Sequence, residues 1–208
     1  MKKFILKLNL MCLLFSSINL FAENYQPTLE NNNNEDYKKS IEIYDKTCND
    51  GYIPNCYYLG LIYHKGEDVK QDFTKAKELY TKACDKGDAI SCNNLGDMYA
   101  REEGVKRNYK TANKFYTKAC NSDEINGCFS LGIAYAGGIG TKTNFIKSRD
   151  YFMKSCKGGI GEGCNFVATL YLNGYGIAKD LEKAKEFFQK GCYLGFKDSC
   201  DNLDKLKK

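Results

Sequence analysis

Apolar and polar residues alternate along residues 37–208 in a pattern that recurs every 36 residues. In the first half of each unit, apolar or small residues fall at offsets 0, 3, 7, 10 and 11. These offsets share one face of an α-helix, and charged residues occupy the opposite face. The pattern therefore predicts five amphipathic helices, each beginning at the first residue of a unit: Tyr37, Phe73, Tyr109, Phe145 and Leu181.

Local signals mark both ends of each first helix. An acidic or amide residue, whose side-chain oxygen can cap free backbone N–H groups, precedes every unit: Asp36, Asp72, Asn108, Asn144 and Asp180. At the other end, a residue suited to a left-handed backbone follows the first cysteine of the unit by three positions: Gly51, Gly87, Asp123, Gly159 and Gly195. The sequence thus predicts a turn after each first helix.

A second helix is expected after each turn, with cysteine, leucine, glycine and tyrosine at offsets 0, 3, 4 and 7 in the first three units. A glycine inside a helix costs about 1 kcal/mol relative to alanine, so its recurrence indicates a neighbouring backbone too close for a side chain. A fixed period of this length is typical of solenoids. The predicted fold class is all-α, a solenoid of five helix-turn-helix repeats.

The two ends of the chain differ from the repeats. Residues 1–22 have the pattern of a signal peptide, because three lysines precede a short apolar stretch that ends in alanine. A transmembrane anchor and a lipid anchor on Cys12 are the alternatives. Residues 23–36 are polar and predict a disordered leader. The expected repeats are 37–72, 73–108, 109–144, 145–180 and 181–208, the last with a polar C-terminal cap.

Ten further cysteines form five Cys-x7-Cys pairs, and an even number in an exported chain favours structural disulfides. Pairing within each repeat is expected, because a short turn between two antiparallel helices brings the cysteines within bonding reach. Metal binding and a catalytic dithiol are the alternatives, although both usually need closer spacings. The expected bridges are Cys48–Cys56, Cys84–Cys92, Cys120–Cys128, Cys156–Cys164 and Cys192–Cys200.

Net charge and histidine content limit the partners and the metal sites that can be expected of this chain. The formal net charge is +5, and removal of the three lysines in residues 1–22 leaves +2. The lysines are interleaved with acids, so nucleic acid is not an expected partner. The single histidine, His64, is expected at the surface and cannot by itself supply a zinc site. Neither a metal nor a cofactor is expected.

The units, for example residues 73–99, resemble Sel-one-like repeats, which are relatives of the tetratricopeptide repeat. With their Cys-x7-Cys pairs they also look like the Helicobacter cysteine-rich protein family. The resemblance covers residues 37–208 and implies a right-handed superhelix of disulfide-linked helix pairs. Members of that family are exported and are commonly assigned as penicillin-binding proteins or beta-lactamases, so the resemblance also implies beta-lactam hydrolysis.

The sequence lacks the motifs of familiar beta-lactamases. No serine is followed three residues later by lysine, and one histidine is too few for a zinc enzyme. The catalytic residues of any such activity are therefore unknown from the sequence.

Three functions remain as hypotheses. Superhelical repeats usually hold a peptide or protein, so the first is a monomeric interaction module, periplasmic or secreted, whose concave face binds such a ligand. A cell-wall peptide is one candidate ligand, and no membrane anchor is expected after signal cleavage. The second hypothesis is the beta-lactamase or penicillin-binding protein that the resemblance implies, since a beta-lactam mimics a peptide end. The third is a thiol oxidoreductase, which needs an accessible, easily reduced bridge.

Overall fold

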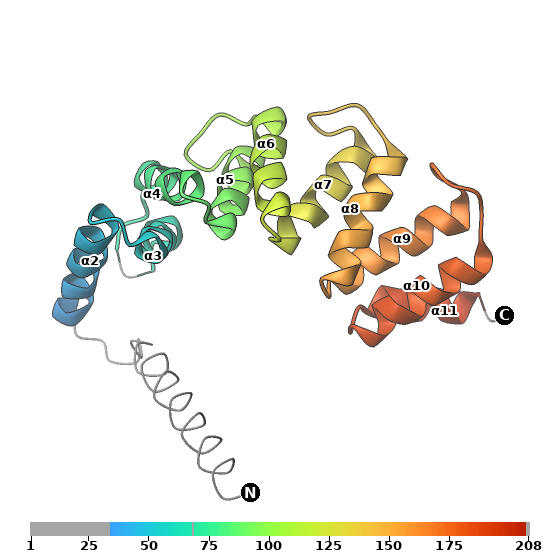
Figure 1. The fold of residues 1–208 in the computed structure, drawn as a ribbon. Helices are drawn as coiled ribbons and strands as arrows, with labels where there is room; N and C mark the ends of the chain where they lie inside the picture. Colours follow the sequence, from blue (N-terminus) through green and yellow to red (C-terminus); the bar gives the residue numbers. More distant parts are fainter. Residues whose placement is uncertain (1–33, 68, 207–208) are drawn as a thin grey trace, which may run out of the picture. The chain divides into compact units, whose positions relative to one another are not determined.

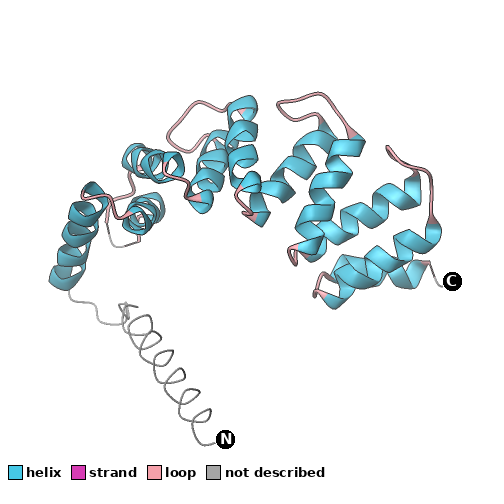
Figure 2. Cartoon of the chain, viewed as in Figure 1, coloured by secondary structure: helices cyan, strands magenta, loops and turns pink. Residues whose placement is uncertain are grey.

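The computed structural model describes residues 34–67 and 69–206. The expected signal peptide (1–22) and most of the expected leader (23–36) lie outside these residues. The chain divides into two units, Met1–Lys38 and Lys39–Lys208, and all of the repeats except their first two residues belong to the second. Every regular element in the described part of the chain is a helix (Figure 2). None of those helices is both long and apolar enough to cross a membrane.

The described helices form five consecutive pairs, each with a short turn between its two members (Figure 1). The pairs are α2 (Asn34–Asn49) with α3 (Ile53–Lys65), α4 (Phe73–Asp85) with α5 (Ala89–Arg101), α6 (Tyr109–Asn121) with α7 (Ile125–Gly137), α8 (Phe145–Lys157) with α9 (Gly161–Asn173), and α10 (Leu181–Tyr193) with α11 (Lys197–Lys205). From α3 to α11 each helix packs against the next one along the chain, and a disulfide bond joins α2 to α3, which is the arrangement of a solenoid.

The predicted N-caps are confirmed in four of the five pairs. The side-chain oxygen of the capping residue accepts the backbone N–H three residues later, at 2.9 or 3.0 Å, for Asp72, Asn108, Asn144 and Asp180. The prediction is wrong for Asp36, because α2 begins at Asn34 and Asp36 lies inside the helix. Residues 28–36 include no proline or glycine that would stop a helix before Tyr37, and the last three residues of the expected leader, 34–36, are helical.

The predicted turns after the first helices are confirmed. The four glycines at this position have φ angles between 84° and 98°. Asp123, which replaces glycine in the third pair, also takes a positive φ of 61°. Aspartate tolerates this left-handed conformation better than most residues, which explains the exception.

Each helix pair contains one disulfide bond, between the two cysteines of its Cys-x7-Cys motif. The S–S distances are 1.99–2.06 Å and the Cα–Cα distances 4.6–4.8 Å, for Cys48–Cys56, Cys84–Cys92, Cys120–Cys128, Cys156–Cys164 and Cys192–Cys200. The cysteines of the first four bridges are buried, whereas those of the last are half-buried. An oxidoreductase needs an accessible bridge, so burial of four of them argues against that hypothesis.

The recurring glycine of the second helices packs against an aromatic ring of the next pair. A Cβ atom at Gly60 would lie 2.8 Å from the ring of Tyr80, and one at Gly132 would lie 2.5 Å from that of Phe152. Gly96 meets Tyr116 in the same way. The expectation of a close backbone is therefore wrong: an aromatic side chain from the next first helix fills the space.

This contact predicts an asymmetric response to substitution within α7. Replacing Gly132 with valine is expected to lower the free energy of unfolding by about 1–3 kcal/mol, since the buried Phe152 ring has nowhere to move. The same change at Gly137 is the matched control, because that residue is exposed and meets only the flexible Ile139 side chain. Urea unfolding of both variants measures the difference; equal stabilities would show that the ring yields freely.

Candidate functional site

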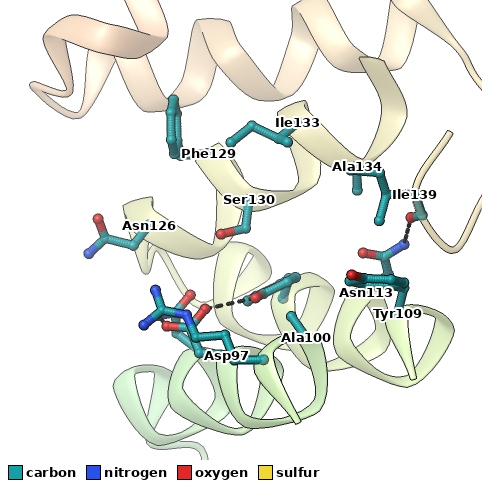
Figure 3. Close-up of a pocket in the computed structure, with 13 residues that line it drawn as sticks. Asp97, Ala100, Tyr109, Asn113, Asn126, Phe129, Ser130, Ile133, Ala134 and Ile139 are labelled. Atoms are coloured by element: carbon teal, nitrogen blue, oxygen red, sulfur yellow. Dashed lines mark hydrogen bonds between the residues drawn. The ribbon is translucent and has the colours of Figure 1, made fainter. Parts of the chain in front are cut away.

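A cavity of about 560 Å³ lies between α5, α6 and α7 (Figure 3). Its volume is within the range of pockets that bind small ligands or short peptide segments. The wall is part polar and part apolar, and the lining residues come from three helices and the loop after α7: Asn93, Asp97, Ala100, Arg101, Tyr109, Asn113, Tyr116, Asn126, Phe129, Ser130, Ile133, Ala134 and Ile139.

Helical periodicity places these side chains. Asn93, Asp97 and Ala100 recur at intervals of four and three residues, so they share the face of α5 that is turned to the cavity. Figure 3 shows Asp97 and Ala100 on one side, with Ser130 and Ile133 of α7 across the space.

One end of the cavity is held in place by the α7–α8 loop. Asn113 of α6 donates a hydrogen bond from Nδ2 to the carbonyl oxygen of Ile139, at 2.7 Å (Figure 3). This bond ties the loop to the helix that forms the middle of the wall. The bond positions the Ile139 backbone, from which the side chain reaches the apolar end of the cavity.

Tyr116 and Asp97 form the main polar contact of the cavity. The Tyr116 hydroxyl donates to Oδ1 of Asp97 at 2.7 Å. Burial, followed by the charge of the Asp97 carboxylate, raises the pKa of Tyr116 well above its usual range. The hydroxyl is thus a permanent donor at neutral pH, and it occupies only one of the two carboxylate oxygens.

Asn93 carries an acceptor that the protein does not use. The residue is only 8% exposed, and among the described residues no donor reaches its Oδ1 atom. Its Nδ2 lies 3.5 Å from Oδ2 of Asp97, at the outer limit of a hydrogen bond. A buried acceptor without a partner costs about 1–3 kcal/mol, and this oxygen atom has almost no accessible surface of its own, so Asn93 faces the cavity with its other atoms.

The same position two repeats later has its acceptor satisfied. Oδ1 of Asn165 in α9 accepts from Oγ of Ser199 and from Nδ2 of Asn202 in α11, both at 3.2 Å. The residues of α7 that correspond to these donors are Gly127 and Ser130. Glycine has no side chain to offer and serine is shorter than asparagine, so α7 supplies no donor to Asn93. The space beside Gly127 is filled by Ala119 and by the backbone of Tyr116.

His64 lies in a second polar cluster, between the first and second pairs. Its Nε2 is 2.8 Å from Oε2 of Glu103, and its Nδ1 is 3.4 Å from the hydroxyl of Tyr80. The expectation of a surface histidine is wrong, because its side chain is only 22% exposed and packs against these neighbours. Tyr80 is fully buried, so this chain of groups offers no hydroxyl that a substrate could reach. It joins two repeats rather than forming an active site.

Sequence reasoning missed the cavity residues. The disulfide cysteines that it singled out are absent from the cavity wall. One feature of the sequence could have pointed to the cavity. The residue after the second cysteine is asparagine in units two and four (Asn93 and Asn165) but aromatic in units one and three. A comparison of the donors available to each asparagine would have separated the two. In the described residues, no three His, Cys, Asp or Glu side chains are grouped to hold a metal ion.

A family model described as the Sel1 repeat matches residues 56–88, 89–124, 125–160 and 161–196. These segments make up more than half of the chain. The protein belongs to the Sel1 repeat family. Each matched Sel1 repeat runs from the second helix of one pair to the end of the first helix of the next, so the cavity spans the second Sel1 repeat and the start of the third.

Solved structures of other Sel1-like proteins share the fold. The protective antigen c5321 of uropathogenic Escherichia coli is 30% identical, with a TM-score of 0.77 over 80% of this chain and 36% of its own. This chain therefore spans about a third of that antigen. A Sel1 repeat protein from Oxalobacter formigenes is 24% identical, with a TM-score of 0.71 over 81% of this chain and 67% of its own.

The Helicobacter resemblance is also supported. Cysteine-rich protein B of Helicobacter pylori is 28% identical to this Sel1 protein, with a TM-score of 0.52 over 64% of this chain and 96% of its own. A search of the curated proteins gave no match.

Proposed function

We propose that this Sel1 protein is an exported interaction module that binds a peptide segment in the cavity between α5, α6 and α7. The observation that carries the proposal is the cavity of about 560 Å³ itself, whose wall combines polar side chains with exposed apolar ones. A peptide offers a carbonyl acceptor at every residue and an N–H donor at every residue except proline, so it can bond polar side chains that both donate and accept. Stacked helical repeats are well suited to peptide and protein partners.

The two halves of the wall fit a peptide ligand. Asn93, Asn126 and Ser130 provide side chains that can both donate and accept hydrogen bonds. Phe129, Ile133 and Ile139 provide apolar surface for a side chain, and the two isoleucines are more than a third exposed. Polar groups fix the orientation of a ligand while apolar contacts supply most of the affinity.

Export is part of the proposal. Disulfides form and persist in oxidising compartments, and this chain has one in every helix pair. The signal-peptide prediction for residues 1–22 agrees with this environment. The periplasm and the cell exterior both satisfy the requirement.

Selection from a random heptapeptide display library tests the proposal, with the disulfide-intact protein as bait. The critical variant is Ser130→Asn, which supplies α7 with the residue that α11 uses to satisfy Asn165. The new amide is expected to bond Asn93 and fill the cavity, so the selected peptides should bind this variant at least about tenfold more weakly. Thermal stability should be unchanged or slightly higher.

Ser122→Asn is the matched control, because it makes the same chemical change at the exposed end of α6. It should bind the selected peptides like the unmodified protein. Failure to select any peptide, or equal affinities for the Ser130 variant and the parent, would overturn the proposal.

A further inference from the structure

We infer that the cavity between α5, α6 and α7 takes an uncharged aromatic ring, such as the phenylalanine side chain of a bound peptide. The inference rests on the proposed function and names the side chain that the peptide must present. It follows from a comparison of the cavity with the equivalent spaces between the other helix pairs, which the protein fills with side chains of its own.

The space between the third and fourth pairs contains a cluster of three aromatic rings. Phe166 of α9 stacks on Phe152 of α8, with 4.6 Å between the ring centroids and 10° between the planes. The ring of Phe129 in α7 lies 5.7 Å from that of Phe152 and 6.0 Å from that of Phe166. Stacked rings attract one another in addition to the apolar area that they bury. The third ring of the cluster, Phe166, thus closes this space.

The cavity keeps the ring on which Phe166 would stack but lacks Phe166 itself. Tyr116 of α6 stands 36 residues before Phe152 and lines the cavity. The two rings are placed alike, since each covers the recurring glycine of the preceding second helix. Ser130 of α7 stands 36 residues before Phe166 and lines the cavity as well. The short side chain of serine therefore leaves the place of a ring unfilled.

The space between the first and second pairs also holds a ring, which comes from a different position. The imidazole of His64 lies edge-on to the ring of Tyr80, with 5.9 Å between centroids and 87° between planes. Ala100 stands 36 residues after His64 and lines the cavity. Both flanking spaces thus contain a ring beside the aromatic residue of the first helix, whereas the cavity has a small residue at each position that supplies one.

The space between the fourth and fifth pairs is closed without a ring. Leu172 stands at the position of Ala100 and packs against the buried cluster that contains Phe188. Asn202 stands at the position of Ser130 and donates a hydrogen bond to an asparagine of α9. Each of the other spaces between described pairs therefore has a larger side chain at one of these positions or at both. The opening is specific to the space between the second and third pairs.

The rest of the cavity wall suits an uncharged ring. Tyr109, Ile133 and Ile139 come from α6, α7 and the loop after α7, and each is 37–39% exposed. A ring in the cavity can remove part of this apolar surface from water. Asp97 and Arg101 are the one acid and the one base among the lining residues, four positions apart on α5. Their charges balance, so the wall has no net charge to attract a charged ligand.

The test uses N-acetyl-phenylalaninamide as the probe and the backbone amide resonances of ¹⁵N-labelled, disulfide-intact protein as the readout. Millimolar probe is expected to shift the resonances of Ala100 and Ser130 saturably, because a bound aromatic ring changes the magnetic field at nearby nuclei. N-acetyl-leucinamide should bind at least about threefold more weakly, since it lacks the stacking contribution. N-acetyl-glycinamide should give no saturable shift.

Two variants fill the cavity with side chains that the protein uses in its other spaces. Ser130→Phe supplies the ring of Phe166, and Ala100→Leu supplies the side chain of Leu172. Each should weaken binding of the probe at least about tenfold. The resonance of Ala100 reports on the first variant and that of Ser130 on the second. Ser122→Phe is the matched control at the exposed end of α6, and it should bind the probe like the parent protein.

Three results would overturn the inference: no saturable shift at Ala100 or Ser130, equal affinities for the phenylalanine and leucine probes, or equal binding of the phenylalanine probe by the parent protein and both filled variants. The peptide selection separates this failure from that of the proposed function. Selected peptides that lose affinity for Ser130→Asn but bind equally well with alanine in place of each aromatic residue would support peptide binding and exclude the ring site.

Discussion

Reduction of the five disulfide bonds is expected to lower the melting temperature of this protein by at least about 20 °C. Each bridge closes a loop with a sequence separation of 8 residues, for which the chain-entropy model gives about 2.5 kcal/mol. A solenoid has no single central core, so its stability is close to a sum over repeats and their interfaces. Loss of a contribution from every repeat therefore weakens the whole array.

The measurement is circular dichroism of two samples in the same buffer, one oxidised and one reduced in denaturant and then refolded with reductant present. A double variant, Cys156→Ser with Cys164→Ser, isolates one buried bridge and should lower the melting temperature by about 5–10 °C. The half-buried pair Cys192 and Cys200, treated in the same way, is the matched control and should cost less. Identical melting of oxidised and reduced protein would show that the bridges do not support the fold.

Replacing Phe152 with alanine is expected to lower the free energy of unfolding by about 3–5 kcal/mol. The ring is 1% exposed, stacks on Phe166 with 4.6 Å between centroids, and lies 5.7 Å from the ring of Phe129. It thus joins the third pair to the fourth. Because repeats contact only their neighbours, the variant should unfold in two steps, with residues after α7 melting first.

Urea denaturation followed by circular dichroism and by tyrosine fluorescence measures both effects. Ile146→Ala is the control in the same helix, since Ile146 is 54% exposed and its loss should change stability by no more than about 0.5 kcal/mol. A single transition with a similarly small loss for Phe152→Ala would contradict the assignment of this ring to the interface between pairs.

The fold could be predicted from the sequence because its determinants are local and repeated. Helix caps, turn residues and cysteine pairs each act within about ten residues, and a 36-residue period shows them five times. The exception at Asp36 is at the first of the five repeats, where the helix follows residues that do not carry the 36-residue pattern. The glycine contact was assigned to the wrong partner, because the period shows that space is required but not which group of the next repeat fills it.

The candidate site could not be predicted in the same way, since it arises where the repeats differ. The missing donor for Asn93 is explained by the residues 34 and 37 positions later, Gly127 and Ser130. Neither residue is unusual by itself. The partly buried position of His64 could not be predicted for the same reason, because its hydrogen-bond partner Glu103 lies in the loop after α5, in the next helix pair.

Each disulfide bond joins cysteines in consecutive helices of one pair, and no described bridge crosses from one pair to another. A bridge can therefore close as soon as its own two helices have left the ribosome or the translocation channel, before the next cysteines emerge. Duplication or deletion of a 36-residue unit also keeps the number of cysteines even. Such a chain can gain or lose a repeat in evolution without creating an unpaired thiol among its repeats.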